Sequence, residues 1–176
     1  MNLAALTLLL FAVVLLAAVT DLRWHKIPNA LTLPTMVVGM LGHTLADGLG
    51  GFLFSFGGLV LGLGVLLGFY ALGGMAAGDV KLLGAVGAIL GPVEVFLVFL
   101  MTAVLGGLYA LGVMVHQGGL VGAVQRIGLI VKTFFLTRKV GIAFASRSAS
   151  QPKLRYGLVI ALGTLTFQFW YWIGVG

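Results

Sequence analysis

The chain has 176 residues, of which 61% are hydrophobic and 8% are charged, and its mean hydropathy is +1.19. These values lie far outside those of soluble globular domains and predict an integral membrane protein. The net charge of +6 does not indicate nucleic-acid binding, because the basic residues are scattered among apolar stretches with no stacking aromatic residues between them; we expect an anionic lipid surface as their partner.

Six apolar stretches predict an all-α, polytopic membrane protein with about six transmembrane helices in a single membrane domain, residues 1–176. The stretches are residues 2–20, 30–46, 51–73, 80–91, 92–115 and 156–174. We interpret the first as a retained helix rather than a signal peptide, because Arg23 and Lys26 follow the apolar run instead of preceding it. The fourth is short, since its residues span only about 18 Å of a hydrocarbon core of about 30 Å.

The basic residues support six spans with the N-terminus outside. In this topology the segments 21–29, 74–80 and 116–155 are cytoplasmic, and they contain or adjoin every Lys and Arg of the chain, as the positive-inside rule requires. A re-entrant fourth stretch would instead send the seven basic residues between 126 and 155 outside. We therefore prefer six spans.

The cytoplasmic segment 116–155 contains the pattern of an amphipathic helix. Apolar residues recur at three- and four-residue spacing from Leu120 to Phe135, and polar residues such as Arg126 and Lys132 occupy the remaining face. We expect this helix to lie at the inner leaflet, before the last span.

The four acidic residues divide between the two sides of the membrane. Asp47 and Glu94 face outward in this topology, whereas Asp21 ends the first span and Asp79 opens the fourth on the cytoplasmic side. Two carboxyl groups on different helices at one membrane face are what aspartic proteolysis requires, because one takes a proton from water while the other polarises the scissile carbonyl. We therefore predict that Asp21 and Asp79 form a catalytic pair.

Five further residues are candidates for a supporting or substrate-binding role. Gly78 lacks a Cβ and lets backbone or substrate approach closely. Lys81 either tunes the ionisation of the pair or extends to the lipid headgroups, and Asn29 either caps the second span or joins the site. Tyr156 and Gly157 either border a substrate groove or pack helices together.

Three sequence blocks together resemble the type IV prepilin peptidase family of membrane aspartic proteases. The blocks are Asp21 followed by Ile27-Pro28-Asn29, then Gly74 to Leu83, then Arg155 to Ala161. The resemblance covers most of the chain and implies that Asp21 and Asp79 are the catalytic aspartates, with Gly78 as the second glycine of the family's GxGD motif. The chain departs from the motif at its first glycine, where Ala76 stands.

The resemblance implies cleavage of the short basic leader of prepilin-like precursors, after a glycine, at the cytoplasmic face of the inner membrane. Larger family members also methylate the new N-terminus and carry a four-cysteine zinc site. Because this chain has no cysteine, the resemblance implies a peptidase-only form, similar to the enzymes that process Flp-type pilins, with archaeal preflagellin peptidases as a neighbouring possibility. We expect no cofactor and no metal; prepilin-like substrates and membrane lipids are the expected partners, and the oligomeric state is not predicted.

Two alternatives remain open from the sequence. A proton-coupled transporter also uses paired membrane acids, although its polar groups are distributed across the bilayer. A catalytically degenerate family member acting in pilus assembly is the second alternative, and Ala76 is the residue that favours it.

Overall fold

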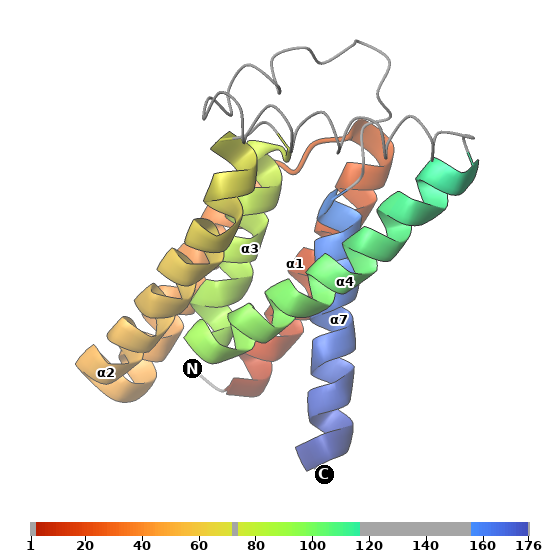
Figure 1. Cartoon of the computed structure of the whole chain (residues 1–176). Helices are drawn as coiled ribbons and strands as arrows, with labels where there is room; N and C mark the ends of the chain where they lie inside the picture. The colour runs from red at the N-terminus through yellow and green to blue at the C-terminus, as the bar shows by residue number, and fades with distance from the viewer. Residues whose placement is uncertain (1–2, 72–73, 117–155, 176) are drawn as a thin grey trace, which may run out of the picture. The chain divides into compact units, whose positions relative to one another are not determined.

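The computed structural model describes residues 3–71, 74–116 and 156–175, and all of its regular elements there are helices. They are α1 (Leu3–Trp24), α2 (Asn29–Ala71), α3 (Ala77–Leu90), α4 (Pro92–His116) and α7 (Tyr156–Val175), as Figure 1 shows. No strand occurs in these ranges, which confirms the all-α prediction.

Helix α2 contains a break at the point where the sequence separates the second and third apolar stretches. Asp47 has φ −138° and ψ 23°, and Gly48 has φ 55° and ψ −131°, so neither is helical. A positive φ suits glycine because it has no Cβ to clash with the backbone. Figure 1 shows the chain reversing its direction here, so that α2 consists of two helical halves.

Four helices are long and apolar enough to cross a membrane: α1, α2, α4 and α7. This agrees with a multi-pass membrane protein. Helix α3 has 14 residues, about 21 Å of length, and is not among the four. The predicted count of six spans is therefore not confirmed. Six spans require that the two halves of α2 cross separately and that the short α3 crosses as well.

Helix α3 is the most enclosed element, because every residue from Leu82 to Ile89 is buried. Its main neighbour is α2, whose glycines face the α3 backbone. A Cβ built on Gly39 would lie 2.7 Å from the carbonyl oxygen of Ala88, and one on Gly62 would lie 2.5 Å from that of Leu83. Small residues let helices in membranes approach closely, and here they bring backbone against backbone.

Gly91 separates α3 from α4. Its φ of 92° is the left-handed region that favours glycine, its N–H donates a hydrogen bond to the carbonyl of Gly87, and Pro92 begins the next helix. The sequence predicted this boundary at the same place, between residues 91 and 92.

The chain divides into two compact units, Met1–Leu105 with Arg155–Gly176, and Gly106–Leu154. Only residues 106–116, the end of α4, are described in the second unit. The predicted amphipathic helix and nearly all of segment 116–155 lie outside the described residues. The single membrane domain stays a prediction.

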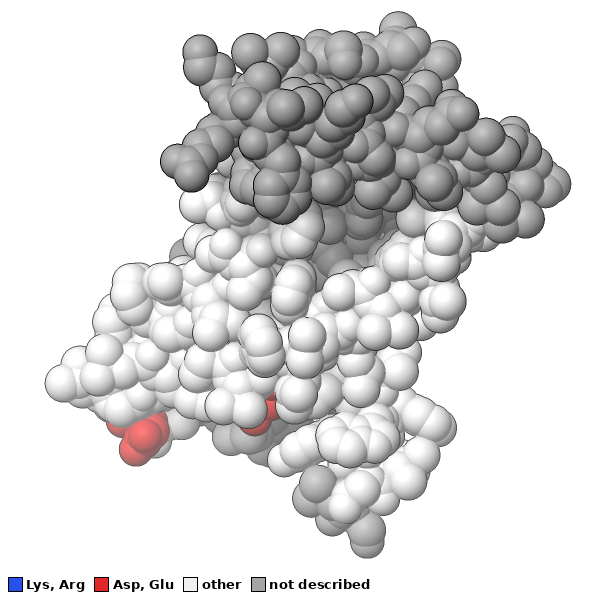
Figure 2. All heavy atoms as spheres, in the orientation of Figure 1, with Lys and Arg blue, Asp and Glu red and all other residues white. Residues whose placement is uncertain are grey.

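Within the first unit, the end of α1, the start of α3 and the start of α7 lie at the same end (Figure 1). The described basic residues Arg23, Lys26 and Lys81 belong to this end or to the loop that follows α1. Asp47 and Glu94 lie at the reversal of α2 and the start of α4, at the opposite end. On the face drawn in Figure 2, the acidic atoms appear at that opposite end and no described basic atom is visible. The described basic residues thus share one end with Asp21 and Asp79, whereas Asp47 and Glu94 lie at the other.

The packing of α2 on α3 predicts unequal effects of alanine at two neighbouring glycines. A methyl at Gly62 meets backbone atoms of Leu83 that cannot move aside, so Gly62→Ala should lower the free energy of unfolding in detergent by about 1–3 kcal/mol. Gly64 has open space around its built Cβ, so the matched Gly64→Ala variant should be neutral or slightly more stable. Thermal or denaturant unfolding followed by circular dichroism measures both. Equal effects would contradict the packing.

Candidate active site

Asp21 lies in the last turn of α1 and is 6% exposed. Its Oδ2 accepts a hydrogen bond of 3.1 Å from the backbone N–H of Leu158, in the first turn of α7. The first N–H groups of a helix have no partner within it, and a carboxylate is favourable at this positive end. Asp21 therefore joins the end of α1 to the beginning of α7.

Asp79 lies in the first turn of α3 and is 5% exposed. Its Oδ2 accepts a hydrogen bond of 3.1 Å from the backbone N–H of Ala76, and its own N–H donates to the carbonyl of Ala76 at 3.1 Å. A carboxylate three residues into a helix that bonds back to the preceding N–H is the second half of a capping box. The carboxyl group is thus held by the start of its own helix.

The structure places the two acids within range of each other's charge. Asp79 precedes the apolar stretch 80–91. Burial raises the pKa of its carboxyl group from 3.8 to about 6, although the hydrogen bond from the N–H of Ala76 lowers this pKa. The charge of Asp21 raises this pKa further. The two carboxyl groups are therefore near enough for the charge of one to act on the other.

Ile27 is a site residue that sequence reasoning did not single out. It is buried between the two glycines that neighbour the acids: a Cβ on Gly78 would lie 3.2 Å from the Cβ of Ile27, and one on Gly157 would lie 2.8 Å from its Cδ1. The Cβ on Gly157 would also lie 3.0 Å from Cγ of Asp21. The sequence feature that could have identified Ile27 is its position in the first block, Asp21 followed by Ile27-Pro28-Asn29. Gly78 and Gly157 are needed here for close packing.

Lys81 and Asn29 contact each other. The ammonium of Lys81 donates a hydrogen bond of 2.9 Å to Oδ1 of Asn29, which is the first residue of α2. This bond ties the beginning of α3 to the first turn of α2 at an exposed position. Tyr156 begins α7 and is half-buried.

The loop after α1 begins with a left-handed residue. His25 has φ 53°, its backbone N–H donates to the carbonyl of Asp21 at 3.0 Å, and its Nδ1 lies 3.2 Å from the same oxygen. A single left-handed residue after the last turn is a common way to end a helix. The turn leads the chain from Asp21 to Ile27 within a few residues.

Ala76, at the first glycine of the motif, is exposed and has φ −85° and ψ 153°. This is extended backbone, which alanine adopts as readily as most residues. Its hydrogen bonds to Asp79 use backbone atoms only. The local geometry therefore does not require a glycine at this position.

In the ranges that the structure describes, no three His, Cys, Asp or Glu side chains come together in a group that could hold a metal ion. The chemistry available at this end is that of two buried carboxyl groups, and burial raises the pKa of one of them, Asp79, to about 6. Such a pair can supply a general acid and a general base within one site.

Residues 8–111 match the profile of the type IV leader peptidase family. The matched region contains Asp21, Ile27 and Asp79, and ends before α7. A search of the curated proteins and a search of the solved structures gave no match.

The interaction between the acids predicts the direction of a pKa change. Because the charge of Asp21 raises the pKa of Asp79, Asp21→Asn should lower it. The protonated-carboxyl band in infrared spectra, titrated against pH and assigned with Asp79→Asn, measures this pKa. The control variant Asp47→Asn, at the opposite end, should leave it unchanged. An unaltered titration in Asp21→Asn would show that the two groups do not interact.

Proposed function

Because the chain belongs to the type IV leader peptidase family, we propose that it is a membrane aspartic endopeptidase with Asp21 and Asp79 as its catalytic pair. Its substrates are prepilin-like precursors, whose leader it removes at the cytoplasmic face of the inner membrane. The observation that carries this proposal is that two buried carboxyl groups, on α1 and α3, lie near enough for the charge of Asp21 to raise the pKa of Asp79.

The proposed reaction uses one proton shared by the pair. The protonated member of the pair donates a hydrogen bond to the scissile carbonyl, while the ionised member accepts a proton from the attacking water. The water oxygen bonds to the carbonyl carbon, and the tetrahedral intermediate forms. The C–N bond then breaks as the leaving nitrogen takes a proton from the pair. The products are the leader with a new carboxylate and the mature chain with a new amine.

The proposed topology has six spans with the N-terminus outside, the two halves of α2 counting separately. Arg23, Lys26 and Lys81 support it, because they share an end with the two acids and the positive-inside rule assigns that end to the cytoplasm. The apolar helix of a substrate docks laterally among the spans, so that its cleavage point reaches this face. The absence of cysteine supports a peptidase without N-methyltransferase activity.

Replacing either acid should abolish processing. Asp21→Asn and Asp79→Asn keep the shape of the side chain but cannot share the proton, so conversion of a prepilin to its mature form should fall by at least about 100-fold. Immunoblotting of co-expressed enzyme and precursor measures the conversion. Asp47→Asn, an acid replaced at the opposite end of the same unit, is the matched control and should retain the wild-type rate.

Folding has to be measured alongside, because Asp79 also caps α3. Asparagine can still accept the hydrogen bond from Ala76, so the helical circular dichroism of Asp79→Asn should match that of the wild type. A folded variant at either position that processes at the normal rate would refute the pair. A wild-type protein that never converts precursor would instead favour a degenerate family member.

The motif departure at residue 76 should have little effect on the rate. Since Ala76 is exposed and extended, Ala76→Gly should change the rate of precursor conversion by less than about twofold. The matched variant Gly78→Ala, two residues away, should reduce the rate strongly, because its methyl would press on Ile27 beside Asp79. If Ala76→Gly instead accelerated conversion about tenfold or more, the methyl at residue 76 would be obstructing the site.

A further inference from the structure

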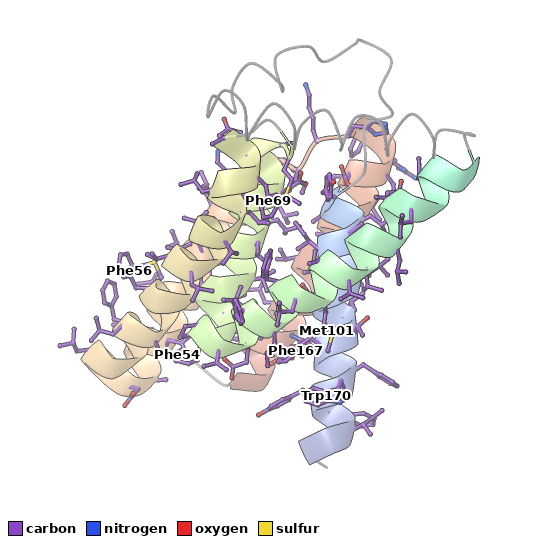
Figure 3. The ribbon with its side chains drawn as sticks, in the orientation of Figure 1. Phe54, Phe56, Phe69, Met101, Phe167 and Trp170 are labelled. Atoms are coloured by element: carbon purple, nitrogen blue, oxygen red, sulfur yellow. The ribbon has the colours of Figure 1, made fainter. Side chains whose placement is uncertain are left out.

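A large cavity opens at the end of the first unit opposite the two acids. Its volume is about 1210 Å³, above the usual range of small-molecule sites, and side chains of α1, α2, α3, α4 and α7 line it. Most of the lining is apolar and aromatic, including Phe11, Phe54, Phe167 and Trp172. Figure 3 shows Phe54, from α2, and Phe167, from α7, near this end. Neither Asp21 nor Asp79 lines the cavity.

Two acceptors in the lining have no partner. Gln168 is 9% exposed, and its Oε1 is buried without a hydrogen bond; the same is true of Oε2 of Glu94. A buried acceptor without a partner is unfavourable, and such groups are uncommon in folded proteins. Both side chains line the cavity, and each buried oxygen exposes less than 1 Å², so a ligand that donates hydrogen bonds there would satisfy it once the side chain rotates toward the cavity.

One donor in the lining, that of His43, is already used. Nε2 of His43 lies 2.8 Å from the carbonyl oxygen of Ile89, which can only accept, so this nitrogen carries the hydrogen and donates it. The ring of His43 is tilted against that of Phe54, with centroids 5.1 Å apart. Among the described residues that line the cavity there is no Lys or Arg. The polar part of the lining therefore includes a carboxyl group, that of Glu94, with no described cation beside it.

The surroundings of the cavity point to a membrane lipid rather than a soluble amine. The last turns of α7 expose Phe169, Trp170 and Trp172, an aromatic belt of the kind found at a membrane interface. A lipid with a primary-ammonium headgroup offers three N–H donors and a positive charge at the membrane interface. The acyl chains of such a lipid match the apolar lining. A choline headgroup has no N–H to donate.

We propose that this cavity binds a phospholipid with a primary-ammonium headgroup, of the phosphatidylethanolamine type. The ammonium donates hydrogen bonds to Glu94 and Gln168, and the acyl chains lie against the aromatic lining. The site is independent of the proposed peptidase activity, because it lies at the other end of the unit and uses none of the residues assigned to that reaction.

Lipid binding to the purified full-length chain in a neutral detergent tests the proposal, with native mass spectrometry as the readout. Phosphatidylethanolamine should bind about tenfold more tightly than phosphatidylcholine with the same acyl chains. Glu94→Gln should remove this preference, whereas Asp47→Asn, an exposed acid at the same end that does not line the cavity, should keep it. Gln168→Met, which removes the second acceptor at nearly constant volume, should weaken the preference as well.

Three results would overturn the proposal. Equal binding of the two lipids would exclude recognition of the ammonium, and an unchanged preference in Glu94→Gln would exclude this cavity. Tight binding of glycerophosphoethanolamine, which has the headgroup without acyl chains, would identify an amine site rather than a lipid site. If Glu94→Gln failed to fold by circular dichroism, the Gln168→Met variant would decide the question. Prepilin conversion is measured separately, so failure of one proposal leaves the other intact.

Discussion

The short helix α3 lies against α2 only because the glycines of α2 let the two backbones touch. Gly39 and Gly62 face carbonyl oxygens of α3 at distances where a side chain would collide. This contact sets the depth of α3 in the unit and, with it, the position of Asp79 at its first turn. The bond between Lys81 and Asn29 ties the same turn to the beginning of α2. The location of the second acid therefore follows from backbone packing more than from any contact of the acid itself.

Each acid has a structural partner of its own before any substrate is considered. Asp79 accepts the N–H of Ala76 and Asp21 accepts that of Leu158, so both carboxyl groups are oriented by helix starts. Hydrogen bonds of this kind offset part of the cost of burying a carboxylate. The offset is incomplete for Asp79, since burial still raises its pKa. A carboxyl group that is oriented by a hydrogen bond and has a raised pKa, as Asp79 is, is suited to exchanging a proton.

The sequence predicted the features that depend on local pattern. The boundary at Gly91, the reversal near Asp47 and the all-helical class follow from apolar run length and from the residues that interrupt it. Counting charges by membrane side paired Asp21 with Asp79. The contacts of Ile27 with Gly78 and Gly157, and the bond of Lys81 to Asn29, join residues far apart in the chain, and periodicity carries no information about them. For the same reason, the sequence does not predict the cavity or its two unpaired acceptors.

Helix α7 connects the two ends of the first unit. Its first turn donates to Asp21, and its later turns line the cavity that holds Gln168. Between them, Gly163 packs against Thr102 of α4 so closely that a built Cβ would lie 3.0 Å from the Thr102 backbone nitrogen. A helix held at its first turn and in its middle has little freedom to slide. The hydrogen bond at Asp21 and the outline of the cavity therefore both depend on the position of α7 along its axis.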